Sequence, residues 1–140
     1  MKLKRAEWYE VPHYWPQVET LVASALRHGN IAFQPEDIYQ SLLGRGMQLW
    51  LALDGEAIRA MAVTHIQVYP RARTCVVMLV GGTGIDRWID FEADLCAWAV
   101  SQGCVAMEGL GRRGWGRKVA DQGWREVWIL YRKRLDAVKD

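Results

Sequence analysis

Phenylalanine is scarce in this chain, with 2 residues among 140, whereas tryptophan occurs 8 times. So many indole rings have to be buried, stacked or part of a contact surface. An excess of one charge is also lacking, because 18 basic and 16 acidic residues leave a formal net charge of +2. Such a balance provides no general attraction to nucleic acid or to an anionic membrane. With 51% hydrophobic and 24% charged residues, the composition excludes disordered, coiled-coil and collagen classes.

Long apolar runs are missing as well. The longest covers residues 75–80, which is far too short to cross a bilayer. The charged N-terminal residues Lys2, Lys4 and Arg5 are followed by no apolar segment of the kind that a secretory signal requires. We therefore expect a cytoplasmic protein without a membrane partner.

Paired cysteines are absent too. Cys75, Cys96 and Cys104 are odd in number, lack CxxC spacing, and each lies inside an apolar segment. This pattern predicts buried, reduced thiols, and it excludes a framework of disulfides. No two candidate ligands have the spacing of a metal site, so no metal is expected.

Apolar spacing and turn residues predict an α+β chain that forms one domain over residues 1–140. Helices are expected over residues 15–28, 34–43, 86–102 and 115–122. Strands are expected over residues 47–53, 58–69, 74–80, 104–110 and 124–135. The first three strands are joined by short turns and should form an antiparallel meander. A helix separates strand 74–80 from strand 104–110, so these two should be parallel, with a right-handed crossover.

Two local features accompany this order. An apolar strand passes into a glycine-rich loop and a long helix at residues 76–86, and a short helix ends in Gly123-Trp124 before the last strand. With them, the chain resembles the GNAT N-acetyltransferase superfamily over roughly residues 11–135. Residues 111–115 look most like small phage and prophage members of that superfamily.

The resemblance implies a fold and a cofactor. In the family, the two parallel strands splay apart, the pantetheine arm of coenzyme A lies between them, and backbone amides hold its pyrophosphate. A helix N-terminus suits this task, because its first amides are unpaired and its dipole is positive. The residues implied in binding acetyl-CoA are Val80, Gly81, Gly82, Thr83, Gly84, Ile85, Asp86 and Arg87.

Four positions depart from the family pattern. Gly81 stands where a glutamine or arginine is usual, and Asp86 stands where a small residue is usual. A carboxylate at Asp86 should repel a pyrophosphate, and it could itself cap the helix. Arg112 occupies the place of a frequent asparagine, and Val119 occupies the place of the tyrosine that acts as general acid.

Two residues are candidates for the base that deprotonates an amine. Glu108 lies on the short second parallel strand among apolar residues, where the pKa of a carboxylate can rise. Its structural alternative is a salt bridge to a nearby arginine. His65 lies on the second strand of the meander and could act directly or through water if its face meets the cleft. Otherwise it is simply packed or exposed.

Binding candidates follow the second parallel strand and precede the first helix. Arg112 and Arg113 could contact a phosphate, and with Trp115 they could stack on an adenine or a nucleobase. They could equally form a surface turn anchored by Trp115. Trp8 and Trp15 cluster around Pro12, where the family often has part of its acceptor-side wall. Trp8, Trp15 and Trp115 are therefore the substrate-binding candidates.

Two functions remain open from the sequence. The first is transfer of an acetyl group from acetyl-CoA to a small or macromolecular amine, by direct attack of the deprotonated amine on the thioester. The alternative is a catalytically degenerate GNAT-fold module that binds nucleic acid or forms part of a phage particle. The apolar last strand also allows pairing with a second copy, which would give a homodimer.

Overall fold

The structure is a computed structural model that describes residues 1–83, 85–111 and 115–136, with the backbone alone for residues 85–88 and 115. The chain divides into two compact units, Met1–Leu110 and Gly111–Asp140. Each unit is described separately.

The first unit is built on a five-stranded sheet in the order β1-β2-β3-β4-β5. The strands are β1 (Lys2–Ala6), β2 (Gln48–Asp54), β3 (Ala57–Val68), β4 (Arg73–Gly82) and β5 (Ala106–Gly109). Neighbouring strands are antiparallel except for β4 and β5, which are parallel. This arrangement confirms the predicted meander and the parallel pair that follows it.

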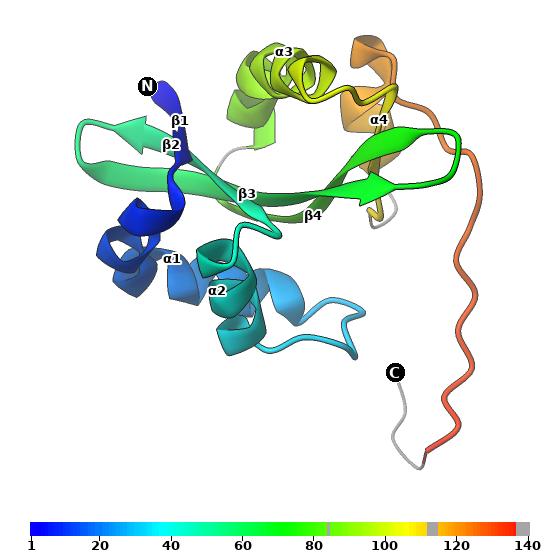
Figure 1. Ribbon diagram of the computed structural model, residues 1–140, viewed down its shortest axis with the longest axis horizontal. Coiled ribbons are helices and arrows are strands. Elements are labelled where there is room, and N and C mark those ends of the chain that lie inside the picture. The colour runs from blue at the N-terminus through cyan, green and yellow to red at the C-terminus, as the bar shows by residue number, and fades with distance from the viewer. Residues whose placement is uncertain (84, 112–114, 137–140) are drawn as a thin grey trace. The chain divides into compact units, whose positions relative to one another are not determined.

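Helices flank the sheet on both faces. One face carries the 3-10 turn η1 (Trp8–Glu10) and the helices α1 (Val11–Leu26) and α2 (Pro35–Leu43), whereas α3 (Ile85–Ser101) lies on the other face (Figure 1). The predicted α+β class with helices around a mixed sheet is thus confirmed. Among the described residues, we find no helix with the length and apolar character needed to span a membrane.

The sequence reading missed β1. Its residues pair with β2, with Leu3 opposite Ala52 and Ala6 opposite Leu49. Three charged residues in this segment hid the strand pattern, and such charges are typical of an edge strand, because they discourage pairing with other chains.

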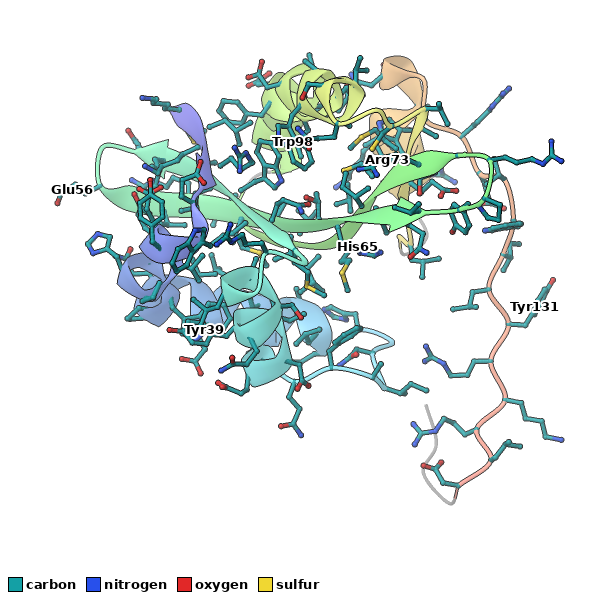
Figure 2. The ribbon with its side chains drawn as sticks, viewed as in Figure 1. Tyr39, Glu56, His65, Arg73, Trp98 and Tyr131 are labelled. Atoms are coloured by element: carbon teal, nitrogen blue, oxygen red, sulfur yellow. The ribbon has the colours of Figure 1, made fainter. Side chains whose placement is uncertain are left out.

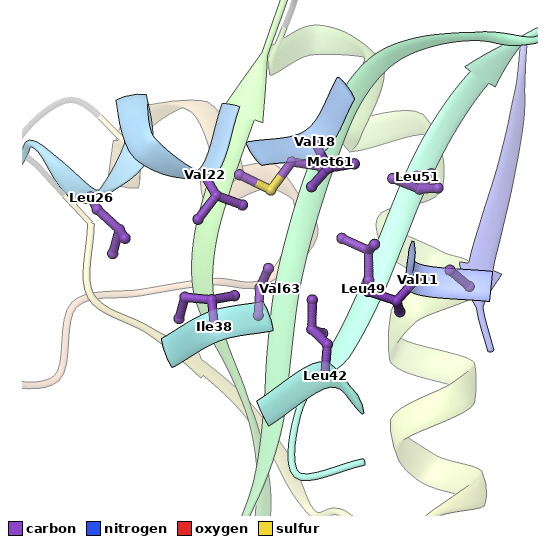
Figure 3. Packing of buried hydrophobic residues seen from close by; sticks show 11 residues of the cluster. Val11, Val18, Val22, Leu26, Ile38, Leu42, Leu49, Leu51, Met61 and Val63 are labelled. Atoms are coloured by element: carbon purple, nitrogen blue, oxygen red, sulfur yellow. The ribbon is translucent and has the colours of Figure 1, made fainter. Parts of the chain in front are cut away.

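The α1–α2 face holds the larger part of the core. Val18 and Val22 of α1 are fully buried, as are Met61 and Val63 of β3 (Figure 3). Helix α1 begins four residues before the predicted start, because Val11, at 1% exposure, belongs to this core. Pro16 consequently lies inside the helix and not in its first turn.

The α3 face has a smaller, aromatic core. The rings of Trp50 and Trp98 meet edge to face, with centroids 5.2 Å apart. The indole N–H of Trp50 donates to Thr64 Oγ1 at 2.9 Å, so the polar atom of this buried ring has a partner. Trp50 and Trp98 therefore belong to the core of this face, whereas the side chain of Trp88 lies outside the described residues.

The second unit contains α4 (Trp115–Val119) and the 3-10 turn η2 (Ala120–Gln122), which replace the single predicted helix over residues 115–122. Gly123 ends the turn with a left-handed φ of +90°. Residues 124–135 form neither helix nor strand, so the predicted last strand is wrong for this structure. Its β-branched and aromatic residues favour a strand, but a strand forms only when a neighbouring strand accepts its hydrogen bonds.

Gly82 closes β4 and is expected to tolerate no side chain. Its φ is +114°, and an added Cβ would lie 2.4 Å from the carbonyl oxygen of Arg59. Gly55 also has a positive φ, +61°, but an added Cβ there meets nothing within 4 Å. Gly82→Ala should therefore lower the free energy of unfolding by about 1–3 kcal/mol more than Gly55→Ala does. Urea denaturation of both variants measures the difference, and equal losses would contradict the steric argument.

Candidate functional site

Strand β4 contains a bulge at Met78. Val63 of β3 pairs with Leu79, but the next residue, Thr64, pairs with Val77. Met78 is therefore an extra residue on β4, and such an insertion bends the strand and redirects its backbone groups. Bulges of this kind often lie next to functional sites.

Strand β4 also runs past the end of β5. The last pair between them joins Val77 to Gly109, whereas β4 continues to Gly82. Within the described ranges, residues 78–82 therefore have no β5 partner on the edge that faces away from β3. Helix α3 starts at Ile85, immediately beyond this stretch, so unpaired strand amides and a helix N-terminus follow each other along the chain.

The sheet register brings both predicted bases into one row. His65 pairs with Val76 on β4, and Val76 pairs with Glu108 on β5. Residues directly opposite each other on neighbouring strands project from the same face of a sheet. Figure 2 shows His65 on the face that carries α1 and α2, opposite to Trp98. Two strand spacings separate the backbones of His65 and Glu108 by about 10 Å.

The bulge determines this row. Without the extra residue, the register that joins Val63 to Leu79 would place His65 opposite Val77. The β5 neighbour of Val77 is Gly109, which has no side chain. The insertion of Met78 is therefore what aligns His65 with Glu108.

Two polar atoms on this face are buried without a hydrogen-bond partner in the described part of the chain: His65 Nδ1 and Thr74 Oγ1. Thr74 lies two residues before Val76 on β4, so its side chain projects from the same face. Buried polar atoms normally have a partner, and an unsatisfied one costs about 1–3 kcal/mol. Both atoms suit a face that binds a polar molecule.

The sequence offers a salt bridge to a nearby arginine as the alternative to a catalytic role for Glu108. Arg112 and Arg113 lie outside the described residues, as does Gly84. Among the residues that are described, no ion pair involves Glu108.

The predicted glycine loop is in part a strand. Gly81 and Gly82 belong to β4 and pair with Met61 and Ala60. The N–H of Thr83 donates to the Arg59 carbonyl at 3.0 Å. The glycine at position 82 is thus explained by its close approach to β3.

The remaining cofactor candidates divide into two groups. Val80 packs on the α3 side of the sheet beside Trp50 and Leu95. Ile85, Asp86 and Arg87 form the first turn of α3, where only the backbone is described.

The aromatic candidates have neighbours of their own. Trp8 is 43% exposed, with the Arg45 guanidinium 5.0 Å from its ring centroid in a cation–π contact. Trp15 packs on the core, and its ring centroid lies 4.8 Å from that of Tyr39. The side chain of Trp115 lies outside the described residues. Trp8 therefore offers a ring surface to solvent, whereas Trp15 is mainly structural.

Two of the thiols, those of Cys75 and Cys96, are unsuited to nucleophilic catalysis. Burial raises the pKa of Cys75 to about 11. Burial and a hydrogen bond to the Glu92 carboxylate, with Sγ 2.6 Å from Oε1, raise the pKa of Cys96 to about 12. The prediction of buried, reduced thiols is confirmed for Cys75 and Cys104, whereas Cys96 is half-buried. The described side chains contain no group of three residues that could hold a metal ion.

Several solved structures that share this fold are acetyltransferases by name. A probable acetyltransferase matches over 100% of both chains, with 12% identity and a TM-score of 0.70. An aminoglycoside acetyltransferase from an uncultured soil metagenomic sample, in complex with sisomicin, matches over 96% of both chains, with 12% identity and a TM-score of 0.71. A ribosomal-protein-alanine N-acetyltransferase from Brucella melitensis biovar Abortus 2308 matches over 96% of this chain and 100% of its own, with 14% identity and a TM-score of 0.70.

No family model matches the chain, and no curated protein does. The structural likeness shows the fold, so the resemblance to the GNAT superfamily is confirmed at that level.

The raised thiol pKa values predict a loss of stability in alkali. The unfolded chain releases its thiol protons near pH 9.0, whereas the folded chain holds them until about pH 11 at Cys75 and about pH 12 at Cys96. The contribution of each thiol to the free energy of unfolding is therefore complete below pH 9 and falls above it. The fall is up to about 1.4 kcal/mol per pH unit for buried Cys75, and it is smaller for half-buried Cys96 because solvent screens that thiol.

Urea denaturation between pH 8 and pH 11 measures this loss against the variant Cys75→Val/Cys96→Ala. The variant keeps every other titrating group, so its stability should decline less steeply. Parallel curves for the two proteins would show that the thiols contribute nothing.

Proposed function

We propose that the chain is an acyltransferase that moves an acetyl group from acetyl-CoA to an amine. The observation that carries this proposal is the arrangement around β4, in which a bulged strand extends beyond its parallel neighbour and leads into a helix N-terminus. The row of His65, Val76 and Glu108 lies beside the bulge. Backbone donors and side-chain bases are thus supplied by the same short stretch of sheet.

The backbone would hold the cofactor. Amides of residues 78–82 that face away from β3 have no β5 partner in the described structure, so they are able to donate to a bound amide chain. The first amides of α3 suit a pyrophosphate. When bound, acetyl-CoA supplies the thioester that accepts the amine. When the amine attacks, negative charge develops on the carbonyl oxygen of the thioester. Donors that are fixed in the sheet stabilise this charge without reorganisation, which is the basis of their catalytic value.

Glu108 and His65 would accept the proton of the attacking amine. An ammonium ion is not a nucleophile, so one proton has to leave before the new C–N bond forms. The pair lies on one face, and the roughly 10 Å between their backbones leaves space for a water that relays the proton. His65 Nδ1 is buried and unsatisfied among the described residues, so it is suited to accept from such a water.

The acceptor class is suggested by the structural neighbours. Their names point to aminoglycosides and to an alanine of a ribosomal protein. Both acceptors present a primary amine, so a panel of sisomicin and short peptides with an N-terminal alanine is the appropriate first screen.

The proposal predicts binding of acetyl-CoA and CoA in the micromolar range by titration calorimetry. Asp86 lies in the first turn of α3, so Asp86→Ala should remove a like charge and tighten binding about two- to fivefold. Absence of binding at millimolar ligand would overturn the proposal and favour the degenerate binding module.

The base assignment has a separate test in the rate of thiol release with an active amine. Glu108→Gln and His65→Gln should each lower kcat by about 10²-fold or more, with little change in KM for acetyl-CoA, and should shift the pH profile. Glu56→Gln, on the exposed turn between β2 and β3, is the matched control and should keep full activity (Figure 2). Cofactor binding with unchanged kcat in both variants would refute the bases while leaving the acyltransferase proposal intact.

A further inference from the structure

We propose that the solvent-facing side of α1 is an interface between two copies of this chain, with the two α1 helices antiparallel across a two-fold axis. All of the residues concerned lie in the first unit, and the inference is independent of the proposed activity. It rests on a stripe of exposed uncharged side chains, on two unfavourable backbone features in the same surface, and on two opposite charges at its margin.

The exposed side of α1 is uncharged over the first half of the helix. Residues 11–18 contain no Asp, Glu, Lys or Arg. The turn η1 continues directly into α1, and four exposed residues follow the spacing i, i+3, i+4 and i+7: Tyr9, Pro12, His13 and Pro16. Side chains at this spacing share one face of a helix. Such a face is typical of the centre of a protein interface, where charged residues are depleted and aromatic residues are enriched.

Pro16 is the first unfavourable feature of this surface. It lies inside α1, where a proline has no N–H to donate to the carbonyl of Pro12, four residues earlier. Its ring also crowds that carbonyl. Because Pro16 is exposed, packing within the chain does not offset this cost. A rigid apolar ring that the fold does not need is suited to a contact with another molecule.

Arg45 is the second unfavourable feature. Its φ is +63°, the one positive φ of a non-glycine residue in the part of the chain that the structure describes. The N–H of Arg45 donates to the Leu42 carbonyl, and the N–H of Gly46 donates to the Ser41 carbonyl. This is the pattern of a helix end at which glycine normally takes the left-handed position. The unusual backbone places the Arg45 guanidinium 5.0 Å from the ring centroid of Trp8, next to the stripe.

The stripe is complementary to itself. When the two-fold axis of an antiparallel pair passes between Pro12 and His13, Pro12 of each copy faces His13 of the other. Tyr9 of each copy then faces Pro16 of the other, because each lies three residues beyond the central pair. The same surface is thus used by both copies, as a two-fold interface requires. An exposed aromatic ring meets a proline ring at both ends of the contact.

Two opposite charges flank the stripe on the side toward α2. Arg45 directly follows the end of α2, and Glu19 lies one turn after Trp15, whose ring contacts Tyr39 of α2. Neither Arg45 nor Glu19 has an ion-pair partner among the described residues. The two-fold axis brings the α2 sides of both helices together, and it places Glu19 of one copy within reach of Arg45 of the other. This charge complementarity selects a second copy as the partner.

The size of the face indicates a reversible dimer. α1 has 16 residues and is therefore about 24 Å long. Together with Trp8 and Arg45, two such helix faces would bury on the order of 1,000 Å², which is at the lower limit for a specific interface. We therefore expect a dissociation constant in the micromolar range.

Light scattering on the full-length chain from about 5 to about 200 μM tests the proposal. The mass should rise with concentration from 16.0 kDa toward about 32 kDa. Pro16→Lys places a charge opposite Tyr9 of the second copy and should weaken the dimer about tenfold or more. The same change removes a proline from a helix interior, so it should raise the Tm of the monomer, measured at about 1 μM. A residue with only a structural role would not change association and stability in opposite directions.

Reversal of the two charges gives the decisive result. Arg45→Glu and Glu19→Arg should each weaken the dimer about fivefold or more, because each variant brings like charges together at both ends of the contact. A mixture of these two variants pairs opposite charges at both ends, so it should form a heterodimer with about the affinity of the wild type. Arg71→Glu makes the same charge change on the exposed turn between β3 and β4, and this control should dimerise like the wild type.

Three results would overturn the proposal. The first is a wild-type chain that remains monomeric at about 200 μM. The second is a dimer that none of the variants at Pro16, Arg45 and Glu19 weakens, which would place the association on another surface. The third is a loss of affinity in both charge variants without recovery in their mixture, which would exclude the antiparallel arrangement.

Discussion

The register of β4 is the constraint on which the rest of the structure depends. This strand pairs antiparallel with β3 on one edge and parallel with β5 on the other, and the extra residue Met78 shifts the first pairing by one position. Side chains alternate between the faces of a sheet, so such a shift decides which residues of three strands meet. Here it places His65 and Glu108 in one row on either side of Val76.

The same strand separates two kinds of core. Its α1–α2 face continues into a core of aliphatic residues, where Leu79 packs with the buried helix valines. On its α3 face, Cys75 clusters with Ala99 and Cys104, and this core continues into the tryptophan pair Trp50 and Trp98. The buried side chains under α1 and α2 are mainly aliphatic, with Trp15 at the margin, whereas the rings of Trp50 and Trp98 provide much of the bulk under α3.

Much of the fold could be predicted from local pattern. The meander follows from the turns after residues 54 and 69, and the parallel pair follows from the helix between β4 and β5. β1 was missed because its charged residues hide the alternation. Proline favours the first turn of a helix, which would start α1 beside Pro16, but burial of Val11 outweighs this preference and the helix begins at Val11. Both the pairing of β1 and the start of α1 depend on tertiary packing, which a local sequence pattern does not reveal.

The candidate site was predictable residue by residue, but its geometry was not. A carboxylate on a short apolar strand and a histidine on a long one are each visible in the sequence, whereas their common row depends on a bulge at Met78. A methionine does not mark a bulge in a sequence, so the bulge at Met78 could not be predicted. A glycine, in contrast, indicates a special backbone conformation, as at Gly82 with its positive φ.

β5 combines the functional and the structural demands on the sheet. The strand has only four residues, and one of them, Glu108, belongs to the row with His65. Because β5 ends at Gly109, residues 78–82 of β4 have no β5 partner in the described structure. A longer β5 would pair with residues 78–82 of β4, whereas a shorter one would lose Glu108. The short strand leaves its apolar flanks, Val105 and Leu110, exposed within the described structure.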